Sequence, residues 1–383
     1  MGFDADYGKV TTEYGEIPPD EPVLILRARD TQTPALLGHY RDLCEAAGSP
    51  PSYLRVLREN RDQVIRWQAC HPGELRVPGT EPGSLVPPEV SLPEDCSPAR
   101  FVSPFQVGVT GTGRKFELTF PGSLLVTGSR GSGRTNLENV IIAQLARCTD
   151  TVIFRICFTG GRSTRPWMMP WIEGRTPRPV IDWLATTREE AGLMLDALIA
   201  GCAARARYGG DQEKITPSAG TPAVILVADS MSVARSGLIP KLAEFAEVSR
   251  SEGMSLLRTE LSGDTSIPAE VRIGLRAASL AGAGLIFPGD RKAVRALARL
   301  RNPGDGVVQA GRHRSLTVRF CRIGPDQVRE TALVTGQLRS APEDRLAAAM
   351  GEAYEQRWTR PHGLDLVREW RETADLPGPP AWR

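Results

Sequence analysis

The chain has 383 residues, of which 41% are hydrophobic, so it can fill a sizeable core and leave room for a smaller second domain. Its net charge of only +2 excludes a polycation, so any contact with nucleic acid must come from a local basic patch. No leader sequence and no membrane-spanning apolar run is found, which predicts a cytoplasmic protein that reaches a membrane only through a partner. The scattered cysteines predict neither a zinc site nor a disulfide framework.

Residues 1–75 are expected to form a small, mostly helical N-terminal module. A short strand is predicted at residues 23–26, and apolar residues at helical spacing predict helices at 34–47 and around 53–67. Residues 76–104 are rich in proline and glycine, a composition typical of an extended connector. We therefore place the domain boundary in that connector.

The pattern of residues 105–360 predicts an α/β domain. Two runs, 105–109 and 115–120, flank a glycine-rich turn and indicate a hairpin. After residue 123, apolar strands alternate with helices, which favours a three-layer domain with a largely parallel sheet covered on both faces. The expected strands after the hairpin are residues 124–127, 151–157, 223–228, 255–261, 284–287 and 316–320. Residues 361–383 are expected to be a C-terminal tail.

The strongest functional signal is the segment 128–135, which reads GSRGSGRT and lies between an apolar strand and a helix. Its glycines permit tight turning, and the exposed N–H groups at the start of the helix form a cradle for the phosphates of a nucleotide. Thr135 is placed to bind Mg²⁺ through its hydroxyl. The usual lysine of such a loop is replaced by Arg134, which keeps the charge but is longer and forked. The expected nucleotide-binding residues are Gly128, Ser129, Arg130, Gly131, Ser132, Gly133, Arg134 and Thr135.

A second signal lies about 95 residues later, where the run AVILVADS occupies residues 223–230. A buried strand that ends in an aspartate brings a carboxylate to the Mg²⁺ shell of such nucleotide sites, so Asp229 is the expected metal residue beside Thr135. Hydrolysing enzymes of this type usually carry an acid at the next position. This chain has Ser230 there, and a serine is no general base at neutral pH without activation.

The chain resembles the FtsK/SpoIIIE family of DNA translocases, especially the transfer proteins of actinobacterial conjugative elements. The resemblance is carried by the stretches TGSRGSGRTNLENVIIAQLARC, FRICFTGGR, PWMMPWIEG, VIDWLATTREEAGLML, VRIGLR and AAAMGEAYEQRW. It implies a RecA-like core, bound ATP or ADP with Mg²⁺, assembly into a homo-oligomer such as a hexameric ring, and double-stranded DNA as the partner. It also implies that Arg258 or Thr259 lies where the family senses the γ-phosphate.

Four polar positions depart from the family pattern, namely Cys157, Thr159, Arg134 and Ser230. Loss of a water-orienting group lowers turnover by orders of magnitude while nucleotide binding survives. We therefore predict a nucleotide-binding protein with weak or no ATP hydrolysis. It would act in DNA transfer as a regulatory or scaffolding member, beside an active translocase or a membrane-anchored partner.

Two alternatives remain open at this stage. The first is an active ATP-driven DNA translocase in which another acid, such as Glu260, replaces the missing one. The second is a module like the type VII secretion ATPases, with a peptide as its partner, because a fold alone does not decide the partner.

Basic residues gather between residues 291 and 322, with few acids among them. They predict a surface that contacts DNA phosphates, and the competing interpretation is a solvated helix face followed by a charged hairpin. The DNA-binding candidates are Arg291, Arg295, Arg299, Arg312 and Arg314.

Overall fold

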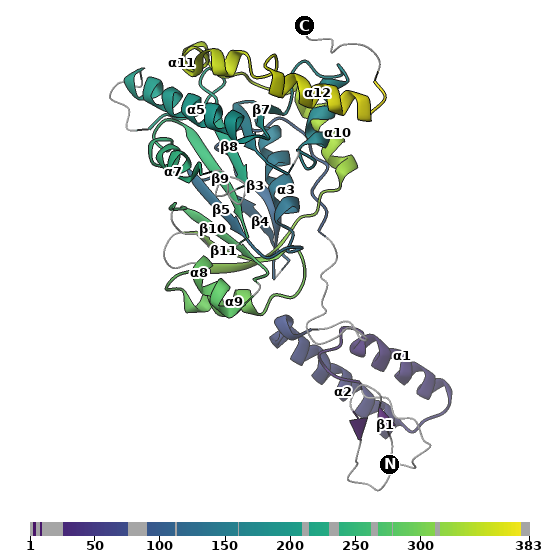
Figure 1. The fold of residues 1–383 in the computed structure, drawn as a ribbon. Coiled ribbons are helices and arrows are strands. Elements are labelled where there is room, and N and C mark those ends of the chain that lie inside the picture. Colours follow the sequence, from purple (N-terminus) through teal and green to yellow (C-terminus); the bar gives the residue numbers. More distant parts are fainter. Residues whose placement is uncertain are drawn as a thin grey trace. The chain divides into compact units, whose positions relative to one another are not determined.

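The computed structural model describes residues 3–4, 8–9, 26–75, 90–111, 113–159, 161–208, 214–229, 237–261, 267–277, 279–310 and 315–376. The chain divides into two compact units, Met1–Val86 and Pro87–Arg383, which are treated separately below (Figure 1).

The first unit is built on a helical hairpin. Helix α1 spans Thr33–Ala46 and α2 spans Pro51–Cys70, which confirms the two predicted helices. The 3-10 turn η1, Pro72–Glu74, follows, and the short strands β1, Phe3–Asp4, and β2, Gly8–Lys9, pair in antiparallel fashion. Proline stands at the start of both helices, where the missing N–H group has no intrahelical partner to lose. The strand predicted at 23–26 falls almost entirely outside the described residues.

One large sheet organises the second unit. Within its described residues, ten strands form the order β4-β3-β12-β11-β10-β5-β9-β8-β6-β7. Strands β10, β5, β9, β8, β6 and β7 are parallel to one another, while β11, β12, β3 and β4 continue the sheet in antiparallel fashion. The strands are β3 Phe105–Thr110, β4 Lys115–Leu118, β5 Ser123–Thr127, β6 Thr151–Ile156, β7 Ile181–Ala185, β8 Ala223–Asp229, β9 Met254–Glu260, β10 Val271–Leu275, β11 Asp305–Ala310 and β12 Ser315–Phe320. The predicted hairpin and the largely parallel sheet are confirmed.

Helices cover both faces of this sheet (Figure 1). They are α3 Arg134–Ala146, α4 Arg165–Ile172, α5 Arg188–Tyr208, α7 Ile239–Val248, α8 Leu280–Ile286, α9 Arg291–Ala298, α10 Pro325–Thr335, η2 Gly336–Leu338, α11 Asp344–Glu355 and α12 Pro361–Thr373. One apolar cluster joins the sheet to α3, α4, α10 and α12, and a second joins it to α5, α7 and α11. The predicted three-layer arrangement is therefore present. No helix in the described part of the chain has the length and apolar character needed to cross a membrane.

The central strands are apolar on both sides because each faces a helical layer. In β8, Ile225 and Val227 pack in the α3 layer, while Val224 and Leu226 pack in the α5 layer. Successive side chains of a strand point to opposite faces, so a strand covered on both faces must be apolar throughout. This explains why the run before Asp229 carries no polar residue.

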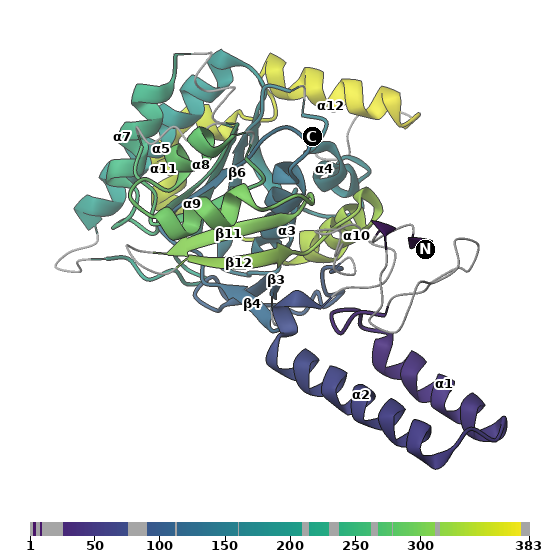
Figure 2. The ribbon, with the colours of Figure 1, turned by 90° about the horizontal axis from the view of Figure 1, so that it is seen from below.

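The strand predicted at 284–287 is wrong, because these residues belong to helix α8 and its end. Ser279 caps the helix, and its Oγ accepts a hydrogen bond from the Gly282 N–H at 3.1 Å. Ala283 and Phe287 are buried in one cluster with residues of α9 and β11. Figure 2 labels α8, α9 and β11. A short apolar run fits a buried helix as well as a strand, and the serine cap is the signal that distinguishes them.

Both ends of the second unit are more firmly packed than the sequence suggested. Residues 90–104, expected to belong to an extended connector, bury Leu92 and Phe101 in the core, and the Leu92 N–H donates to the Arg322 carbonyl at 3.0 Å. Residues 361–373, expected to belong to a tail, form α12, whose Trp370 is buried in the same core as α3. The remaining connector residues, 76–89, lie outside the described part.

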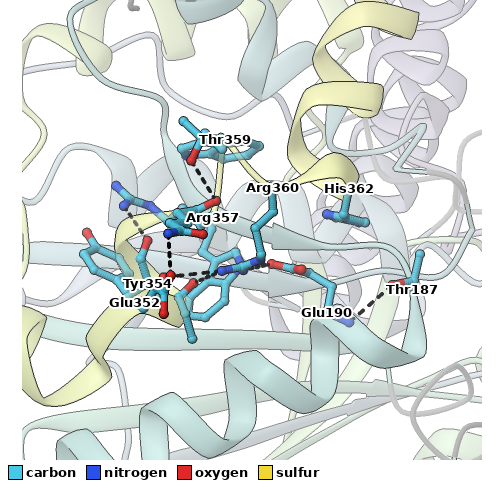
Figure 3. Close-up of polar contacts among 12 residues, drawn as sticks. Thr187, Glu190, Glu352, Tyr354, Arg357, Thr359, Arg360 and His362 are labelled. Atoms are coloured by element: carbon cyan, nitrogen blue, oxygen red, sulfur yellow. Dashed lines mark hydrogen bonds and ion pairs between the residues drawn. The ribbon is translucent and has the colours of Figure 1, made fainter.

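The turn between α11 and α12 is tied to β7 and α5 by a polar network (Figure 3). Tyr354 donates to Asp182 Oδ2 at 2.7 Å, and Arg357 pairs with Asp182 Oδ1 at 3.2 Å. Arg360 forms an ion pair with Glu190. The two carboxylates are buried, so each needs these donors to offset the loss of water.

Glu190 also shows how the start of α5 differs from a full capping box. Its N–H donates to Thr187 Oγ1 at 3.3 Å, as expected for the serine/threonine half of such a box. Its carboxylate instead accepts from Trp183 Nε1 at 2.7 Å and from Arg360. The Glu190 carboxylate therefore binds the turn before α12 instead of capping α5.

His362 makes the attachment of α12 sensitive to pH. The Thr186 N–H donates to His362 Nε2 at 3.2 Å, which requires the neutral ring, and burial lowers the pKa of His362 despite the attraction of Glu190. Arg360 also faces the ring and lowers its pKa further, whereas Asp365 raises it. The unfolded chain takes up this proton near pH 6.5, so we expect stability to fall as the pH drops below 6.5.

The measurement is the thermal unfolding midpoint between pH 7.5 and 5.5, compared between the wild type and His362→Gln. The variant should lose less stability on acidification than the wild type. His39→Gln, on α1 of the other unit, serves as the control and should keep the wild-type dependence. Equal pH dependence of His362→Gln and the wild type would contradict this account.

Candidate nucleotide site at the carboxyl edge of the sheet

The segment 128–135 joins β5 to α3 as a tight loop. Gly131 and Gly133 have φ angles of +72° and +102°, a region that glycine enters without strain. The Ser132 N–H donates to the Ser129 carbonyl at 3.2 Å, and Gly133 stands at the N-cap of α3 with no side-chain cap. The first N–H groups of α3 therefore lack a capping side chain, which is the arrangement that binds phosphate.

Three neighbouring segments hold the loop in this shape. The Gly128 N–H donates to the Glu260 carbonyl at 3.1 Å, and the Ser129 N–H donates to the Arg276 carbonyl at 3.0 Å. On the other side, the Gly304 N–H donates to the Ser132 carbonyl at 2.9 Å. The loop is thus bound to the ends of β9 and β10 and to the approach to β11, and these hydrogen bonds fix its shape.

Asp229 ends β8 on the face of the sheet that α3 covers. Residues 225 and 227 of the same strand pack in the α3 layer, and alternation carries Asp229 to that side. Its register partner on β9 is Thr259, which therefore lies on the same face. Asp229 therefore lies on the α3 side of the sheet, and its role as a Mg²⁺ ligand stays a prediction.

Two charged residues that the sequence analysis did not single out lie on the same α3 face of the sheet as Asp229 and Thr259. Glu138, on α3, and Arg155, on β6, form a buried ion pair, and Arg155 Nη2 also donates to Ser163 Oγ at 2.9 Å. The Glu138 carboxyl is hydrogen-bonded to Thr259. Glu138 is an acid within the apolar second turn of α3, and this could have been recognised in the sequence. Because a buried charge is rarely left unpaired, such an acid predicts a buried ion pair.

The charges around Arg134 act on one another. Burial raises the pKa of Glu138, Arg155 opposes that shift, and the negative charge of Asp229 adds to it. Burial lowers the pKa of Arg134, whereas the attraction of Asp229 and Glu138 raises it. Arg134 thus lies in the field of two carboxylates at the mouth of the phosphate loop.

The two residues predicted to sense the γ-phosphate point to opposite faces of β9. Thr259 shares the α3 face with Asp229, while Arg258 lies on the α5 face together with Leu256. Arg258 is fully buried, and its Nη1 donates to Glu260 Oε1 at 2.8 Å. Glu260, the acid considered as a substitute base, is therefore held in an ion pair on the far side of the strand from α3.

The predicted DNA-binding arginines are only partly placed. Arg291, Arg295 and Arg299 are exposed and recur every fourth residue along α9 and its end, so they share one side of the helix. Asp290 caps this helix, accepting from the Ala293 N–H at 2.9 Å. Arg312 and Arg314, like Ser230 of the phosphate site, lie outside the described residues.

No protein-family model matches this sequence, and no curated protein matches it. Among solved structures, the chain is similar to the cytoplasmic domain of the type VII secretion ATPase EccC of Thermomonospora curvata, with a TM-score of 0.50 and 16% identity. The match covers 70% of this chain and 34% of the EccC chain, so the chain spans about a third of that protein's length. The second unit has a RecA-like P-loop fold.

Two further solved structures match this chain with lower TM-scores. The pCW3 conjugation coupling protein TcpA, in its monomer form with ATPγS, has 15% identity and a TM-score of 0.45 over 63% of this chain and 75% of its own. EssC of Geobacillus thermodenitrificans, ATPases 2 and 3, has 12% identity and a TM-score of 0.46 over 77% of this chain and 53% of its own. At such identities a match describes the fold alone.

The donors of the P-loop unit suit Mg²⁺ held together with a nucleotide. Thr135 supplies a hydroxyl and Asp229 a carboxylate, and oxygen ligands are those that Mg²⁺ prefers. No group of three or more histidine, cysteine or acidic side chains within the described residues can hold a metal by itself. The remaining ligands of a magnesium ion would therefore come from phosphate oxygens and water.

Proposed function

We propose that the P-loop unit binds ATP or ADP with Mg²⁺. The single observation that carries the proposal is the loop 128–135, which opens α3 without a capping side chain and is held from three sides. Residues 128–135 would hold the phosphates, with Arg134 supplying positive charge. Thr135 and Asp229 would ligate Mg²⁺, which neutralises phosphate charge when bound.

We propose further that the bound nucleotide is hydrolysed slowly or not at all. A general base must be free to accept a proton near the γ-phosphate. Glu138 is ion-paired with Arg155, and Glu260 is ion-paired with Arg258 on the other face of β9. Each carboxylate is therefore held by an arginine side chain instead of being free for that role. The serine at position 230 and these two ion pairs support slow or absent hydrolysis. We therefore propose a protein in which nucleotide binding controls assembly.

The proposed partner is double-stranded DNA. The row of exposed arginines on α9 supports it, because guanidinium groups repeated along one helix side suit a phosphate backbone. In this proposal the chain acts in DNA transfer as a regulatory or scaffolding member. It assembles into a homo-oligomer such as a hexameric ring. An active translocase or a membrane-anchored protein would be its working partner.

The test is steady-state ATP hydrolysis by the purified chain, with and without long double-stranded DNA, beside Thr135→Ala. We expect nucleotide binding without measurable turnover in the wild type, and weaker binding in Thr135→Ala because the Mg²⁺ ligand is lost. Turnover that rises with DNA and disappears in Thr135→Ala would contradict the proposal and identify an active translocase. Binding of nucleotide together with an acidic or apolar peptide, but not DNA, would favour the secretion alternative.

A further inference from the structure

A cavity of about 570 Å³ lies at the opposite edge of the sheet from the phosphate loop. It is lined by residues at the end of α5, by residues 214–216 and 221 just before β8, and by the start of α11. The phosphate loop follows the carboxyl end of β5, and β5 is parallel to β8 through β9. The amino end of β8 therefore belongs to the other edge. Figure 1 shows α5 and α11, the two helices that contribute to it.

The floor of this cavity, which we call the amino-edge pocket, is a rigid ion pair. Arg205 is 5% exposed, and its Nε and Nη2 donate to the two carboxylate oxygens of Glu343, each at 2.7 Å. Arg205 Nη1 also donates to the Glu252 carbonyl at 2.7 Å. A bidentate pair with a further backbone contact has one preferred geometry, so it joins α5 to the start of α11 as a fixed surface.

Two further cations, Lys214 and Arg345, line the walls of the amino-edge pocket, and the lining holds no second acid that would balance their charge. The Arg345 guanidinium lies over the Tyr208 ring at 5.0 Å from its centroid, which orients it by a cation–π contact. Lys214 lines the pocket as well. In the described part of the chain, neither Lys214 nor Arg345 forms an ion pair. The lining therefore holds three cations and one carboxylate, a net charge of +2.

Neutral donors complete the amino-edge pocket. Thr216 and Thr221 contribute hydroxyls, and the turn before β8 is held by the Thr221 N–H, which donates to Ser218 Oγ at 3.2 Å. The start of α11 has no side-chain cap, because the Glu343 carboxylate is bound to Arg205.

We propose that the amino-edge pocket binds a small organic anion that carries phosphate or several carboxylate groups. Its volume is within the range of small-molecule sites, and its cations and hydroxyls are the donors that such groups accept from. The ligand is distinct from the proposed nucleotide, because the two sites lie at opposite edges of the sheet. The proposal does not depend on nucleotide binding at the phosphate loop.

The test is calorimetric titration of the full chain with inorganic pyrophosphate and, separately, with citrate. Both titrations use the Gly133→Val background, in which the phosphate loop is disabled. We expect one site per chain, and a loss of affinity of at least about ten-fold when Lys214→Ala and Arg345→Ala are combined, since two charges are removed. Both side chains are exposed, so the double variant should melt like its parent.

The matched control removes an arginine and a lysine from α9 by Arg291→Ala and Lys292→Ala, and it should bind as its parent does. Stronger binding of pyrophosphate than of citrate identifies a phosphate ligand, and the reverse identifies a carboxylate ligand. The proposal is overturned if neither anion binds at millimolar concentration. It is also overturned if the pocket variant and the α9 variant bind equally well.

Discussion

Gly133→Val should weaken nucleotide binding at least about a hundred-fold, which corresponds to roughly 2.7 kcal/mol. Gly133 has a φ of +102°, and a β-branched residue is strained there by on the order of 1–3 kcal/mol. A Cβ at this position would also lie 3.1 Å from the Gly304 nitrogen, a backbone atom that cannot move without releasing Ser132. The loop must therefore change shape, and its N–H groups no longer converge on the phosphates.

The matched control is Gly111→Val in the β3–β4 hairpin, where an added Cβ meets nothing within 4 Å. Nucleotide affinity should be unchanged there. The measurement is fluorescence titration with a labelled ATP analogue, together with a melting curve for each variant. If Gly133→Val keeps wild-type affinity, the phosphates do not bind at residues 128–135.

Arg339→Met should lower the free energy of unfolding by about 3–5 kcal/mol. Arg339 is buried, and its Nη1 donates to the Ala146 carbonyl at 3.0 Å and to the Leu145 and Cys148 carbonyls at 3.4 Å. Burial lowers the pKa of Arg339 to about 10, so it remains charged at neutral pH. A cation there satisfies the last carbonyls of α3 and is attracted by the negative end of the helix dipole. Methionine would remove this donor from the Ala146 carbonyl, while the Leu145 and Cys148 carbonyls would keep their hydrogen bonds from Thr151 Oγ1.

The control is Arg368→Met on α12, which removes an exposed ion pair with Asp365 and should change stability by less than about 0.5 kcal/mol. Urea unfolding followed by circular dichroism measures both variants. Equal midpoints for Arg339→Met and the wild type would show that other donors or water replace the guanidinium. Because α3 begins at the phosphate loop, Arg339→Met should also weaken nucleotide binding if the helix frays.

Structural features that are encoded by consecutive residues were predicted well. The loop 128–135 needs glycines at Gly131 and Gly133 for its left-handed turns, and the buried strand before Asp229 needs an unbroken apolar run. Both patterns are written in consecutive residues, so the α/β class, the parallel sheet and the position of the loop followed from them. The same reasoning failed at residues 284–287, where three apolar residues after a glycine fit either kind of element.

The sequence by itself determined the fold class, the phosphate loop and the strand that brings Asp229 to the same edge, because each rests on local turn chemistry or on an unbroken apolar run. Only the tertiary structure decided which charges neutralise one another. Glu138 meets Arg155 from another element, Arg258 and Glu260 face away from α3, and Arg339 reaches the end of a helix far away in sequence. Such pairings depend on which layer covers each face of the sheet, and the energy of a buried charge depends on the partner it meets there.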